Sequence, residues 1–133
     1  MMNILAIDPG VESGIAIRFD GGKISAIVSY TPEYVWEIVI SMKWNAVVYE
    51  NFTTAGRISR YGLHTVQIIG GIRALCIERK IKCYPRTPQS RMAFQVQAKN
   101  ILNKGIAIHA VEALAHLLSW ENEYVNQISS KTI

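Results

Sequence analysis

The segment NILAID, residues 3–8, is the feature that most limits how this 133-residue chain can fold. Its apolar residues form a run that is too short for a buried helix and typical of a strand covered on both faces. Asp8 ends the run, and Pro9-Gly10 turns the chain directly afterwards. A carboxylate in this position predicts either an aspartate-initiated turn or a functional group at the edge of a sheet.

The residues that follow predict an antiparallel meander of three strands. Residues 14–19 alternate apolar and polar side chains and are rich in β-formers, and Asp20-Gly21-Gly22 is a tight-turn signal. Residues 23–30 then return as the third strand.

Helices and short strands alternate in the rest of the chain. Thr31-Pro32-Glu33 is a helix start, with a capping hydroxyl, a proline in the first turn and an acid near the amino end. The apolar spacing that follows predicts a helix to Met42, a strand at 46–49, a helix at 62–80, a strand at 81–84 ended by Pro85, and a helix at 106–120. Residues 89–104 and the last dozen residues give no clear pattern. The order predicts one α/β domain over residues 1–133, with a mixed five-stranded sheet flanked by helices.

Charge is distributed unevenly along the chain. Residues 51–110 hold ten of the 14 Lys and Arg residues and a single acid, Glu78. A basic middle segment favours a polyanionic partner, most simply nucleic acid, although a solvated basic surface would have the same composition.

Composition excludes several other classes of protein. Half of the residues are apolar and no apolar run reaches the length of a membrane helix, so we expect no membrane partner and a cytoplasmic location. Cys76 and Cys83 lack CxxC spacing and a nearby Cys or His cluster, which favours two free thiols.

Two carboxylates share one kind of position. Asp8 ends the first predicted strand and Glu50 ends the fourth. If these strands are parallel neighbours, both side chains emerge at the same edge of the sheet, where α/β proteins bind ligands. Clustered carboxylates repel one another, so such a site suits a hard divalent cation.

The last predicted helix supplies further candidates. His109, Glu112 and His116 are spaced i, i+3 and i+7, which places them on one face of the helix. This stripe could reach the sheet edge and complete a site for two Mg²⁺ or Mn²⁺ ions that hydrolyse a phosphodiester. Alternatively, Glu50 could be plain solvated surface, and His109 and Glu112 an ordinary exposed helix face.

Four stretches, ILAIDPGVESGIAI, AVVYENF, TVQIIGGIRALC and HAVEALAHLL, resemble the RuvC-type Holliday junction resolvases, in particular their short phage-encoded branch, within the ribonuclease H-like superfamily. The resemblance reaches to about residue 120. It implies a ribonuclease H-like fold and a homodimer that cuts two strands of a four-way junction symmetrically. It also implies divalent metal ions, no nucleotide cofactor, and the host cytoplasm as location for a phage-encoded protein.

Carried over residue by residue, the resemblance assigns Asp8 and Glu50 as catalytic metal ligands. His109 falls where the family has an acid or a histidine, and Glu112 falls where it normally has its final aspartate. Glu112 departs from that pattern by one methylene, which could lower activity or change the metal preference. The resemblance also implies a helix-mediated dimer contact, for which we expect Ile68, Ile69, Gly70, Gly71 and Ile72.

Basic and aromatic residues predict the DNA contacts. Arg57, Arg60 and Tyr61 follow Glu50 closely, and Tyr61 could stack on a base. Arg86 and Arg91 could contact phosphates, which positions DNA without reading its sequence.

Three alternatives remain open. A ribonuclease H-type hybrid nuclease would share the carboxylates but act as a monomer on RNA–DNA hybrids. A junction-binding module with little cleavage would follow if Glu112 does not support catalysis. An actin-like ATPase would share the Asp-Pro-Gly turn, but it requires a duplicated domain that 133 residues cannot supply.

Overall fold

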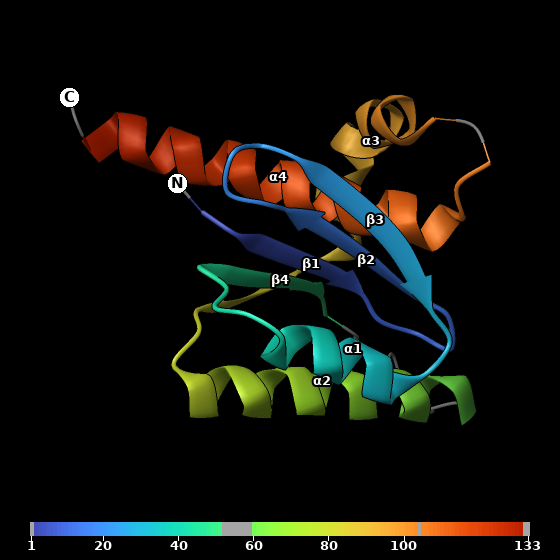
Figure 1. Ribbon diagram of the computed structural model, residues 1–133. Coiled ribbons are helices and arrows are strands. Elements are labelled where there is room, and N and C mark those ends of the chain that lie inside the picture. The colour runs from blue at the N-terminus through green and yellow to red at the C-terminus, as the bar shows by residue number, and fades with distance from the viewer. Residues whose placement is uncertain (1, 52–59, 104, 132–133) are drawn as a thin grey trace.

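The computed structural model describes residues 2–51, 60–103 and 105–131. Five strands form one sheet in the order β3-β2-β1-β4-β5. Strands β1, β2 and β3 form the antiparallel meander, and β4 and β5 run parallel to β1. The predicted mixed five-stranded sheet is therefore confirmed (Figure 1). The strands are β1 (Ile4–Asp8), β2 (Ser13–Arg18), β3 (Ile24–Ser29), β4 (Ala46–Glu50) and β5 (Cys83–Arg86).

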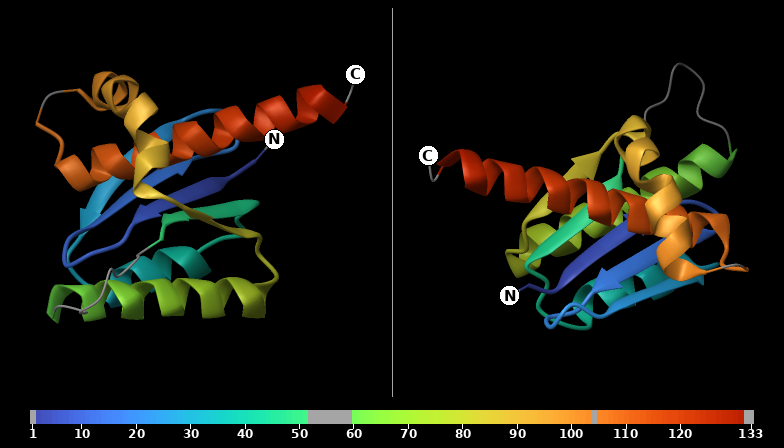
Figure 2. Two further views of the ribbon diagram at one scale, coloured as in Figure 1. Left: turned by 180° about the vertical axis from the view of Figure 1, so that it is seen from behind. Right: turned by 90° about the horizontal axis from the view of Figure 1, so that it is seen from above.

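The helices lie in two layers, one on each face of the sheet. Helices α1 and α2 pack together on one face, and α4 crosses the other face beside α3 (Figures 1 and 2). None of the described helices has the length and apolar content needed to span a bilayer. The helices are α1 (Pro32–Ile40), α2 (Arg60–Arg79), the 3₁₀ helix η1 (Pro88–Phe94), α3 (Gln95–Leu102) and α4 (Ile108–Lys131).

Three parts of the chain differ most from the sequence predictions. Strand β5 continues through Pro85 to Arg86, because β5 is an edge strand where a proline need not remove a ladder hydrogen bond. Residues 88–102, which gave no clear pattern, form η1 and α3. Helix α4 continues past residue 120 to Lys131, where ion pairs support it: Arg18 of β2 pairs with Glu121, and Arg86 of β5 pairs with Glu123.

Strand alternation divides the core into two clusters of different character. The side chains of Leu5, Ile7 and Tyr49 pack on the α1–α2 side, with larger residues. On the α4 side the strands contribute smaller side chains, including Ala6 and Ala16. The smaller side chains allow α4 to lie close to the sheet.

Gly14 on β2 marks the closest approach of α4. A Cβ atom at Gly14 would lie 1.7 Å from the carbonyl oxygen of His109. Gly14 is also the register partner of Asp8 on β1. The missing side chain therefore lets the amino-terminal turn of α4 rest directly beside Asp8.

Helix α2 uses its isoleucines inside the protein. Ile68, Ile69 and Ile72 are buried in the cluster under α1 and the sheet, so their assignment to a dimer contact is corrected: the chain's own core takes up these side chains.

The two glycines of α2 differ in their surroundings. Gly71 is required by packing within the chain, since a Cβ there would lie 2.3 Å from the Trp36 indole nitrogen. That nitrogen donates to the carbonyl oxygen of Ile68. Gly70 is different, because a Cβ there meets nothing within 4 Å.

We predict that Gly14→Ala lowers the free energy of unfolding by an amount at or above the upper end of the ~1–3 kcal/mol typical of overpacking. The reason is that the obstacle is the His109 backbone and not a flexible side chain. Thermal or urea unfolding measures the change. Gly10→Ala is the matched control, because its Cβ would meet its nearest neighbour, the Glu12 carbonyl oxygen, at 3.3 Å. Equal, small effects of both substitutions would contradict the contact.

Candidate active site

Strand alternation points two carboxylates at the same face of the sheet. Asp8 continues the set formed by Ile4 and Ala6 on β1, and Glu50 continues the set formed by Ala46 and Val48 on β4. Because β1 and β4 are parallel neighbours, both carboxylates lie at the carboxyl ends of their strands on the α4 side. The structure therefore places Asp8 and Glu50 at the same edge of the sheet, as the sequence predicts.

Helix α4 adds a histidine and a third carboxylate. His109 Nδ1 lies 3.0 Å from Asp8 Oδ2 and 3.6 Å from Glu112 Oε2. Ligand atoms of Asp8, His109 and Glu112 all lie within 4.8 Å of one another. Within the described part of the chain, this is the one group of three or more such side chains that could hold a metal ion.

The electrostatics of Asp8 fit a cation site. Burial, followed by the neighbouring Glu112 and Glu50 carboxyl groups, raises the pKa of Asp8 to about 10. Without a cation, negative charge on Asp8 is therefore strongly disfavoured. Carboxylate oxygens with one imidazole nitrogen form a donor set that suits Mn²⁺ and Mg²⁺, with the imidazole favouring the less strictly oxygen-seeking Mn²⁺. The residues present fit a divalent ion.

The surroundings of Glu50 favour its ionised form, in contrast to those of Asp8. Its Oε1 atom lies 2.9 Å from His116 Nε2 and accepts a hydrogen bond of 3.0 Å from Arg91 Nε. Burial alone would raise the pKa of Glu50, but the contacts with His116 and Arg91 outweigh burial and lower it. Glu50 is therefore an ionised carboxylate of fixed orientation, and neither of these contacts uses its Oε2 atom.

The structure gives His116 a role that the sequence analysis did not assign, although the sequence placed this residue on the same helix face as His109 and Glu112. Its side chain is fully buried, with Nε2 on Glu50 and Nδ1 3.4 Å from Ser90 Oγ. Ser90 in turn donates to the carbonyl oxygen of Thr87, which fixes the hydroxyl. The spacing indicated its position, since His116 lies seven residues after His109 and so projects from the same side of α4.

The two arginines predicted to contact phosphates have internal partners. Arg91 contacts Glu50, lies 4.0 Å from Glu112 and donates to the Gln95 carboxamide, so it belongs to the carboxylate cluster. Arg86 donates to both carboxylate oxygens of Glu123, and its side chain is only 12% exposed. Arg86 therefore secures α4 to β5, which counts against a direct phosphate contact for this residue.

The remaining predicted DNA contacts stay predictions. Arg57 lies outside the described residues. Arg60 and Tyr61 form the start of α2, where the structure describes the backbone and not these side chains.

Comparisons with solved structures identify the fold. The Thermus thermophilus RuvC in complex with a Holliday junction substrate is similar over 89% of this chain and 92% of its own, with a TM-score of 0.68 and 17% sequence identity. The fowlpox virus Holliday junction resolvase is similar over 92% of this chain and 99% of its own, with a TM-score of 0.62 and 17% identity. The protein has the ribonuclease H-like fold of these resolvases. No family model and no curated protein matches the sequence.

We predict that Asp8→Asn raises the melting temperature of the metal-free protein at pH 8, and that the gain shrinks as pH falls toward 4. The folded-state pKa of Asp8 lies far above its unfolded value of 3.8, so the folded state holds a proton that the unfolded chain releases between these values. Folding stability from this group is therefore complete below pH 4 and is lost as pH rises. Thermal unfolding in a chelator at several pH values measures the effect.

Asp20→Asn is the control, because Asp20 is an exposed residue of the β2–β3 turn. A gain in melting temperature for Asp8→Asn that does not vary with pH would contradict the raised pKa of Asp8.

Proposed function

We propose that this protein is a divalent-metal-dependent endodeoxyribonuclease that resolves four-way DNA junctions by hydrolysing phosphodiesters. The observation that carries the proposal is the convergence of Asp8, His109 and Glu112, with Glu50 alongside, at the carboxyl edge of this sheet. A fold alone does not define an activity, and this cluster supplies the chemistry.

The choice of branched DNA rests on two further observations. One similar structure holds a Holliday junction substrate, and another is a fowlpox virus resolvase bound to junction DNA. This chain has its own basic middle segment, residues 51–110, which suits a polyanion.

The site residues divide the work. Asp8, His109 and Glu112 would hold one cation, and Asp8 together with the Oε2 atom of Glu50, which neither His116 nor Arg91 contacts, would hold a second. Bound divalent ions supply a more acidic water and stabilise the departing oxygen of the DNA strand. Glu112 takes part despite its extra methylene, since α4 rests close enough for its carboxylate to contact Asp8.

His116 and Arg91 act through Glu50. Both contact Oε1, so the plane of the carboxylate is fixed before substrate arrives. Arg91 also brings a permanent positive charge within 4.0 Å of Glu112, where a phosphate would approach. We assign both as positioning residues, with Arg91 able to turn toward a phosphate when the metal ions neutralise the carboxylates.

We predict that the protein nicks a labelled four-way junction in Mg²⁺ or Mn²⁺, and that Asp8→Asn abolishes nicking while junction binding stays equal or tightens. The substitution removes a metal ligand and also removes negative charge near phosphate. Gel analysis of cleavage, paired with a binding titration, measures both. Asp20→Asn, at the exposed turn, should cut normally.

The same assay separates the alternatives. Junction binding without nicks in either metal would identify a binding module. Cleavage of RNA–DNA hybrids in preference to junctions would identify a hybrid nuclease and overturn the proposal.

Paired nicks require two sites, so we also propose a homodimer through α2. Leu63, Val66 and Gly70 lie on one exposed stripe of this helix, at spacings of three and four residues. A glycine inside a helix costs about 1 kcal/mol relative to alanine, and an added Cβ at Gly70 would meet nothing within 4 Å in the described part of the protomer. Close approach of the same helix from a second copy gives this glycine a reason.

We predict that Gly70→Leu turns the dimer into a monomer without lowering the melting temperature of the monomer. The first side-chain carbon of a leucine there would meet no described residue within 4 Å, whereas the full side chain would block a close helix crossing. Sedimentation analysis measures the mass. Gln97→Leu, at an exposed position of α3, is the control for added surface hydrophobicity. A dimer that survives Gly70→Leu would place the contact elsewhere.

A further inference from the structure

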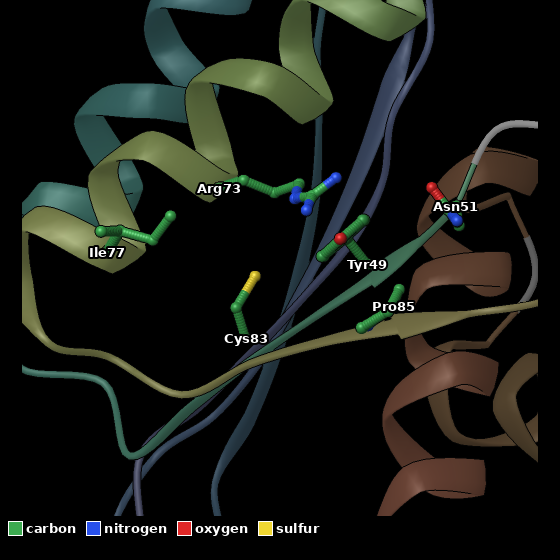
Figure 3. Close-up of a pocket in the computed structure, with 6 residues that line it drawn as sticks. All are labelled: Tyr49, Asn51, Arg73, Ile77, Cys83 and Pro85. Carbon is green, nitrogen blue, oxygen red and sulfur yellow. The ribbon is translucent and has the colours of Figure 1, made fainter.

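A pocket lies on the face of the sheet opposite the carboxylates. Its volume is about 430 Å³, and it opens between the carboxyl-terminal half of α2 and the strands β4 and β5 (Figure 3). Its lining comprises Tyr49, Asn51, Arg73, Ile77, Cys83 and Pro85.

The polar side chains of this pocket offer several hydrogen-bond donors. Arg73 is exposed, forms no ion pair with any residue that the structure describes, and directs its guanidinium toward Tyr49 and Asn51 (Figure 3). Burial raises the pKa of Tyr49, so its phenol keeps its proton. The Asn51 carboxamide adds N–H groups, and no Asp or Glu lines the pocket. An unpaired guanidinium beside neutral donors, without a competing carboxylate, suits an anion.

The position of the pocket connects it to the candidate active site. Glu50 and Asn51 are consecutive residues at the end of β4, with Glu50 on the α4 side and Asn51 lining the opposite pocket. Asn51 therefore brings one edge of the pocket to the carboxyl end of β4, one residue along the chain from Glu50. Ile77 and Pro85 give the pocket an apolar wall and floor against which a sugar can rest.

We propose that this pocket binds a backbone phosphate of the DNA strand, next to the phosphate that the carboxylate site cuts. Arg73 is the main contact, and Tyr49 and Asn51 complete it. The inference deepens the proposed function and rests on it. With this contact, the DNA-binding surface would include the part of α2 that faces β5, in addition to the residues predicted just after Glu50.

The test is a junction-binding titration of Arg73→Gln at several salt concentrations, without divalent ions. Neutralising one phosphate contact should weaken binding and reduce the slope of log K against log salt by about 0.9. Arg79→Gln is the matched control, since Arg79 is an exposed arginine of the same helix that lies beside Lys43 and Trp44, near the amino end of β4. Arg79→Gln removes no phosphate contact in this proposal, so its slope should stay within about 0.2 of the slope of the unsubstituted protein.

A second measurement locates the phosphate. Single methylphosphonates, which lack the phosphate charge, are placed one at a time around the cleavage position of the junction. One position beside the cut should weaken binding to the unsubstituted protein and to Arg79→Gln but not to Arg73→Gln. If no position loses its effect in Arg73→Gln, or if both arginine variants behave alike, the pocket is not a phosphate site. An unsubstituted protein that binds no junction would instead overturn the proposed function.

Discussion

The contact between Gly14 and the backbone of His109 is the constraint on which the rest of the structure depends. Two antiparallel strands bring Gly14 beside Asp8, and the absent side chain lets α4 begin directly above them. From that position the helix delivers His109 and Glu112 to the strand ends, and it carries His116 down to Glu50. Any larger residue at Gly14 would lift the helix and separate the carboxylates that come from the strands from those that come from the helix.

Bringing Asp8 and Glu50 together under α4 costs free energy, and the protein stabilises the two carboxylates to different extents. Glu50 has two cationic or hydrogen-bonding partners, and its charge is stabilised in the protein alone. Asp8 is buried and lies beside the carboxyl groups of Glu112 and Glu50, which raises its pKa and disfavours its charge in the protein alone. The two carboxylates lie side by side on parallel strands, yet their environments push their pKa values in opposite directions. Stability given up at Asp8 is the usual cost of a preformed binding site.

The sequence was informative where a local pattern carries a long-range consequence. Period-two alternation in β1 and β4 fixes the face of Asp8 and Glu50, and period 3.6 in α4 puts His109 and Glu112 together. It was uninformative where partners are chosen by tertiary packing. Arg91 comes from a 3₁₀ segment with no clear pattern, and the pairing of Arg86 with Glu123 depends on how far α4 extends.

The glycine pair in α2 shows the same limit in one place. Sequence alone treats Gly70 and Gly71 alike, as an unfavourable pair inside a helix. In the structure Trp36 from α1 fills the space above Gly71, so that glycine is required by packing within the protomer. Gly70 faces outward one residue earlier, about 100° around the helix, where an added Cβ would meet none of the described residues within 4 Å. Helix α2 thus has one face buried in the core of its own chain, and Leu63, Val66, Gly70 and Arg73 follow one another along its exposed side. The dimer contact and the phosphate contact that we propose would therefore divide this exposed side along the length of the helix, the first from Leu63 to Gly70 and the second from Arg73 onward.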